Sequence, residues 1–85
     1  MQVTISLPDY NPETGYKFQW EDGFEISVSR ETDDIIITAN KEGLISLAQQ
    51  LLYLAQDTFP LGYHLHYDES NSLAEGSAPL IIQKL

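Results

Sequence analysis

Apolar and polar positions follow the two-residue period of a β-strand, or form β-branched runs, in six short stretches of the chain. Each stretch is bounded by residues typical of turns, such as glycine, proline, asparagine and aspartate. The stretches are Val3–Leu7, Tyr16–Trp20, Phe24–Val28, Ile35–Thr38, Tyr63–Tyr67 and Leu80–Lys84. This pattern predicts a protein rich in short antiparallel strands.

The second and third stretches are separated by Glu21-Asp22-Gly23. A three-residue hairpin loop would pair Trp20 with Phe24 and keep the apolar residues of both strands on one face. Such a loop favours a left-handed residue at its last position, where Gly23 stands. We therefore expect a hairpin here.

A helical period replaces the strand period between residues 41 and 57. Asn40 is a suitable N-cap for this helix, because its side chain can accept a hydrogen bond from a free backbone N–H of the first turn. The apolar positions at helical spacing are Leu44, Leu47, Ala48, Leu51, Leu54 and Ala55. We expect this stripe to pack against a sheet.

These elements predict a single domain over residues 1–85 with an α+β fold. It would have two layers, an antiparallel β-sheet of about five to six strands packed on one α-helix. A loop over 69–79 would separate the last two strands.

Both histidines lie in the fifth strand, within Gly62-Tyr63-His64-Leu65-His66-Tyr67-Asp68-Glu69. Alternation puts His64, His66 and Asp68 on one face and the apolar residues on the other. A row of two imidazoles and a carboxylate is compatible with a metal site, with proton chemistry or with recognition of a partner protein.

Metal binding requires ligands that converge on one ion, and three successive same-face residues of a strand span too long a distance. The chain holds no further histidine and no cysteine. It also lacks a Gly-x-Ser-x-Gly nucleophile motif and a phosphate-binding loop. We therefore assign no catalytic residue, no metal and no cofactor. A small metal-binding protein or enzyme that uses His64, His66 and Asp68 stays open as an alternative.

The chain carries 13 acidic and four basic residues, for a net charge of -9. This charge argues against binding to nucleic acid or to an anionic membrane, and it suits a basic protein partner. For the same reason we assign the aromatic residues Tyr16, Phe18, Trp20 and Phe24 to core packing rather than to stacking on bases. The amino-terminal residues do not have the pattern of a signal peptide, so a cytoplasmic location is expected.

Two segments resemble one small family of bacterial immunity proteins, which bind and neutralise the toxin domains of polymorphic or contact-dependent toxin systems. The first runs from Asn40 to Ala48 and continues through Leu51-Leu52. The second begins with residues 62–69. It continues with Asn71, Leu73, Glu75-Gly76-Ser77 and Leu80-Ile81-Ile82. The similarity covers residues 40–84, and Ala78-Pro79 departs from it where an acidic residue is expected.

The resemblance implies a toxin inhibitor with no catalytic residues of its own, whose partner is a cognate toxin domain such as a basic nuclease. The residues that we expect to contact this partner are His64, His66, Asp68, Glu69, Asn71 and Glu75. A regulatory interaction domain with an unrelated partner is a further alternative. The sequence leaves the oligomeric state open.

Overall fold

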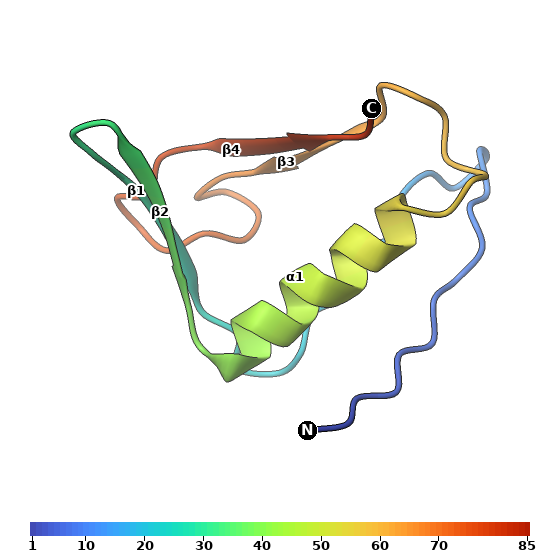
Figure 1. Ribbon diagram of the computed structural model, residues 1–85, viewed down its shortest axis with the longest axis horizontal. Helices are drawn as coiled ribbons and strands as arrows, with labels where there is room; N and C mark the ends of the chain where they lie inside the picture. The colour runs from blue at the N-terminus through green and yellow to red at the C-terminus, as the bar shows by residue number, and fades with distance from the viewer.

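A computed structural model describes residues 1–85 and contains one helix and four strands (Figure 1). The elements are β1 (Ile26–Glu31), β2 (Asp34–Ala39), α1 (Lys41–Leu54), β3 (His64–Tyr67) and β4 (Leu80–Gln83). Strands β1 and β2 form one antiparallel two-stranded sheet, and β3 and β4 form another. The predicted α+β class is confirmed, but the prediction of one sheet with five to six strands is wrong.

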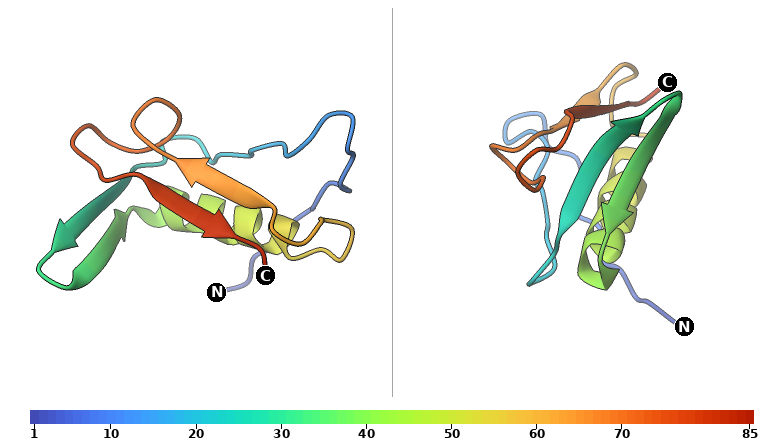
Figure 2. Two further views of the ribbon diagram at one scale, coloured as in Figure 1. Left: turned by 90° about the horizontal axis from the view of Figure 1, so that it is seen from above. Right: turned by 90° about the vertical axis from the view of Figure 1, so that its left-hand side faces the viewer.

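The two sheets and α1 form three sides of a triangle in Figure 1, and Figure 2 shows the same elements from above and from the side. The loop after β3 connects the sheets, because it runs along the free edge of β1. The Ala74 N–H donates to the Ile26 carbonyl and the Ala78 N–H to the Val28 carbonyl, each at 2.8 Å. The core lies between the three sides and includes Ile26, Val28, Tyr53, Leu54, Phe59, Leu65, Tyr67 and Leu73.

The expected strand over 16–20 does not form, so the hairpin around Gly23 does not form either. The backbone of this segment bonds to side chains instead of to another strand. The Gln19 carbonyl accepts a hydrogen bond from Gln50 Nε2 at 2.9 Å, and the Glu21 N–H donates to Ser46 Oγ at 2.8 Å. Gly23 does take the left-handed conformation, with φ of 79°, in a turn that returns the chain to β1.

The expected first strand, Val3–Leu7, is also wrong, since residues 1–10 contain no helix or strand. Alternation alone does not make a strand, because the backbone also needs a neighbouring strand edge. The Pro8 carbonyl instead accepts a hydrogen bond from Gln56 Nε2 at 3.0 Å. This segment therefore runs past the end of α1 without joining either sheet.

Helix α1 begins as predicted and ends three residues earlier than predicted. Asn40 is the N-cap, and its Oδ1 accepts from the Gly43 N–H at 2.8 Å. Leu54 ends the helix, and a turn then places Phe59 in the core with 2% of its surface exposed. Burial of this large ring stabilises the fold more than one further helical turn would.

The buried face of α1 is not the predicted stripe. The helix buries two polar residues, Ser46 and Gln50, while Leu44 and Leu51 remain 56% and 44% exposed. Ala48 and Ala55 are exposed as well, and only Leu47 and Leu54 of the predicted stripe pack on the core. Compared with the predicted packing, the helix is rotated about its own axis, because Ser46 and Gln50 bind the segment over 16–21.

Gln50 is the polar centre of the core, with 1% of its surface exposed. Its Oε1 accepts a hydrogen bond from the Tyr67 hydroxyl at 2.7 Å, and its Nε2 donates to the Gln19 carbonyl. The Tyr16 hydroxyl donates to the Gln50 carbonyl at 2.8 Å. Gln50 therefore joins α1, β3 and the segment over 16–20. No buried side-chain nitrogen or oxygen of the structure lacks a hydrogen-bond partner.

Replacement of Gln50 by alanine should lower the free energy of unfolding by about 2–4 kcal/mol, because it leaves Tyr67 and Gln19 unpaired and opens a cavity. Urea denaturation measures this loss. Gln49→Ala is the matched control, since Gln49 bonds only the side chain of Glu21, and it should cost less than about 1 kcal/mol. Equal costs for the two variants would contradict this role of Gln50.

Burial also makes stability sensitive to alkaline pH. It raises the pKa of Tyr67 to about 12 from 10.0, and burial beside other tyrosines raises the pKa of Tyr16. The unfolded chain therefore releases these protons first, so stability is fully present below pH 10 and is lost as pH rises toward 12. We expect a fall of about 1 kcal/mol per pH unit in this window, measured by urea denaturation, and a smaller slope for Tyr67→Phe. A flat profile would contradict the burial of these phenols.

Candidate partner-binding surface

Strand β3 has the two faces that its sequence predicts. Leu65 and Tyr67 point into the core, with 2% and 1% of their surfaces exposed, while His64 and His66 are exposed on the opposite face. The register of the sheet places Gln83 beside His64 and Ile81 beside His66. The outer face of this sheet is thus a small, uncovered surface of two imidazoles, an amide and an isoleucine.

The two histidine rings lie edge to face with centroids 4.8 Å apart. His64 Nδ1 lies 3.1 Å from the Gly62 carbonyl, which fits an Nδ1–H donor. No group of three or more His, Cys, Asp or Glu side chains is arranged to hold a metal ion. The geometry therefore gives no support to the metal-site alternative at His64, His66 and Asp68.

Asp68 and Asn71 shape the loop that follows β3. Asp68 Oδ1 accepts hydrogen bonds from the Ser70 N–H at 2.9 Å and from Ser70 Oγ at 2.6 Å. These bonds, with the backbone bond to Asn71 and the nearby charge of His66, hold the pKa of Asp68 below its usual range. Asn71 Nδ2 donates to the His66 carbonyl at 2.9 Å, and its Oδ1 accepts from the Asp68 N–H at 3.1 Å.

Of the six expected contact residues, Asp68 and Asn71 are therefore engaged within the loop. His64, His66, Glu69 and Glu75 are exposed and project from β3 and from this loop. The loop itself is anchored, because Leu73 is buried and Ser77 Oγ accepts from the Val28 N–H at 3.2 Å. These four exposed side chains stand on a fixed backbone.

Three aromatic rings form a continuous stack beside this loop. Trp20 stacks on Phe24 with centroids 4.3 Å apart, and Phe18 stacks on Trp20 at 5.8 Å and 5°. Phe18 is 40% exposed, so the prediction that all these aromatic residues serve core packing is wrong for this one. Phe18, Trp20 and Asn71 line a shallow pocket of about 60 Å³.

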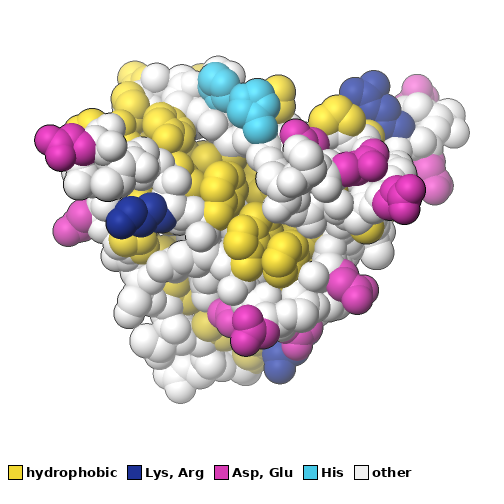
Figure 3. Space-filling view, turned by 180° about the vertical axis from the view of Figure 1, so that it is seen from behind, with side chains coloured by type: hydrophobic (Ala, Val, Ile, Leu, Met, Phe, Trp, Pro, Cys, Tyr) yellow, Lys and Arg dark blue, Asp and Glu magenta, His cyan; other side chains and the backbone are white.

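Figure 3 shows a band of hydrophobic side chains across this face, with the histidine pair at its upper end and acidic side chains around its margins. Protein interfaces often have this anatomy, with an apolar aromatic centre and a polar rim. The contribution of Phe18 and Trp20 was missed in the sequence because their alternation was interpreted as that of a core strand. The high aromatic content of residues 16–24 was the available signal.

A second pocket of about 140 Å³ lies at the end of the β1–β2 sheet. Glu25 is its only ionisable lining residue, and Ala74 of the loop after β3 also lines it. No helix of the structure is long and apolar enough to cross a membrane.

The chain is a small α+β protein with an exposed face that carries a histidine pair and a partly exposed aromatic stack. A family model for Immunity protein 32 matches residues 34–85, which is more than half of the chain. The protein belongs to this immunity-protein family, as the two sequence segments predicted. Neither the curated proteins nor the solved structures give a match to the chain. The matched region includes β3, β4 and the loop between them.

Proposed function

We propose that this protein neutralises a cognate bacterial toxin domain by binding to it, without catalysis of its own. The observation that carries the proposal is the position of the Phe18–Trp20 pocket directly beside the anchored loop. Asn71 lines this pocket, and the exposed Glu69 and Glu75 belong to the same loop. Membership of an immunity-protein family supports a toxin as that partner.

The charge of the chain favours a basic toxin, such as a nuclease. A net charge of -9 attracts a cationic partner over a distance and orients it before contact. A lysine or arginine at the centre of the interface could lie against the exposed face of Phe18 while the acidic side chains compensate its charge. Occlusion of a basic substrate-binding site on the toxin would then follow from this contact.

Asp68 and Asn71 contribute to this function by positioning. Their hydrogen bonds fix the loop in the free protein, so Glu69 and Glu75 need not be ordered when the toxin binds. A smaller ordering cost leaves more of the interaction free energy for affinity.

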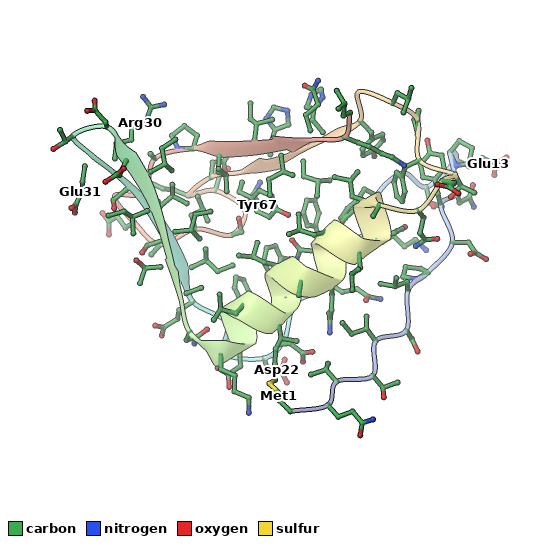
Figure 4. All side chains as sticks on the ribbon, viewed as in Figure 1. Met1, Glu13, Asp22, Arg30, Glu31 and Tyr67 are labelled. Carbon is green, nitrogen blue, oxygen red and sulfur yellow. The ribbon has the colours of Figure 1, made fainter.

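A double charge reversal tests the surface. Glu69→Lys with Glu75→Lys should weaken binding to the toxin encoded beside this gene by about 100-fold and abolish growth rescue on co-expression. The control is Glu13→Lys with Asp57→Lys, which changes the net charge equally at exposed positions away from the loop. Figure 4 shows Glu13 at the far end of the molecule from the β1–β2 turn. Equal losses for both pairs would show that only net charge matters, and rescue by the first pair would contradict the proposed surface.

The histidine pair predicts a pH dependence. Each imidazole carries a positive charge when protonated, so acidification would place more positive charge opposite a cationic partner. The dissociation constant, measured by calorimetry at several pH values, should therefore rise as pH falls from 7.5 to 5.5. His64→Gln with His66→Gln should remove this dependence. Affinity that stays constant over the same range would exclude contact between the histidines and cationic groups.

A further inference from the structure

Strand β2 has an open edge. The Ile26 and Val28 carbonyls of β1 bond the loop over 74–78, so the backbone groups of Ser27 and Ser29 face β2. Their partners in the register are Thr38 and Ile36. The residues of β2 that alternate with these are Ile35, Ile37 and Ala39. Their backbone N–H and C=O groups consequently point away from β1.

The side chains along this edge are apolar and uncovered. Ile37 lies opposite the buried Val28 and shares its face of the sheet, yet it is 45% exposed, and Ile35 is 62% exposed. The exposed stripe of α1, with Leu44 and Leu51, begins just after β2 ends. In Figure 1, β2 lies on the viewer's side of β1, so its open edge faces the viewer.

An open and isoleucine-rich edge is a template for pairing with another strand. Natural proteins protect such edges with a lysine or proline within the strand, but β2 contains neither. Its sequence is Asp34-Ile35-Ile36-Ile37-Thr38-Ala39. The open edge of β2 can therefore pair with a strand of another chain.

We propose that the open edge of β2 pairs with β2 of a second copy of this chain, which gives an antiparallel two-fold dimer with a continuous four-stranded sheet. Two-fold symmetry makes the paired strands antiparallel, and the outward backbone groups must pair with each other. The register with Ile37 opposite Ile37 satisfies both conditions. It pairs Ile35 of each copy with Ala39 of the other.

The charges at the two ends of β2 favour this arrangement. Beyond the Ile35–Ala39 pair, the register places Asp34 of one copy opposite the extended Asn40 of the other, which brings the turn residue Asp33 toward Lys41. Lys41 is also the first residue of α1, where the positive end of the helix dipole attracts an acidic side chain. The acidic turn at Asp33 and Asp34 therefore meets a positive helix end at both ends of the interface. Self-complementary charges of this kind oppose the general repulsion between two acidic chains.

The dimer leaves the proposed toxin-binding surface free. The β2 edge faces the viewer in Figure 1, whereas the hydrophobic band with the histidine pair is seen from behind in Figure 3. Each copy could therefore bind its own toxin. The dimer does not depend on the proposed function.

Sedimentation equilibrium at about 0.15 M salt tests the dimer, with protein concentrations up to about 1 mM. Ile37→Lys should weaken self-association at least about tenfold, because it places two like charges opposite each other at the two-fold axis. Ile36→Lys is the matched control, since Ile36 is similarly exposed on the same strand but points to the other face. It should change association much less.

A charge swap tests the register. Asp33→Lys and Lys41→Asp should each weaken the dimer, and the double variant should restore it, because the opposite charges again face each other. A chain that stays monomeric throughout would overturn the proposal, and so would a dimer that is insensitive to Ile37→Lys. If the chain is monomeric and Ile37→Lys lowers affinity for the toxin, the β2 edge binds the toxin instead.

Discussion

The hydrogen bonds of Gln50 are the constraint on which the rest of the structure depends. A buried amide must satisfy both its oxygen and its nitrogen, because each unpaired group carries a desolvation cost of about 1–3 kcal/mol. Here the oxygen binds the Tyr67 hydroxyl and the nitrogen binds the Gln19 carbonyl. Satisfying both fixes the rotation of α1, the position of β3 and the path of residues 16–20 at once.

This constraint has opposite consequences on the two faces of the molecule. On one face, the segment over 16–20 is held beside the loop after β3, so Phe18 and Trp20 line a shallow pocket together with Asn71 of that loop. On the other face, α1 is rotated so that Leu44 and Leu51 remain exposed. The exposure of these helix residues and the position of the aromatic pocket therefore follow from the same buried polar contacts.

Local patterns in the sequence were sufficient for the cap of the helix and for a strand whose backbone pairs with another strand. Asn40 bonds Gly43 three residues away, and the alternation around His64 and His66 was resolved correctly into a buried and an exposed face. The segment over 16–20 has an equally clear alternation, but its partners Ser46 and Gln50 lie 25 and 31 residues away and are side chains. A two-residue alternation of apolar and polar side chains does not by itself distinguish such a segment from a strand. The candidate site was therefore predicted in its polar part, whereas its aromatic part required the structure.

The central functional claim is that residues 64–77 and 16–20 together form the surface that binds the toxin. Amide hydrogen exchange of the chain, measured with and without the toxin encoded beside it, tests this claim most directly. We expect toxin binding to slow exchange in both of these segments and to leave exchange in β2 unchanged. Slower exchange confined to β2 and α1, with residues 64–77 unaffected, would contradict it.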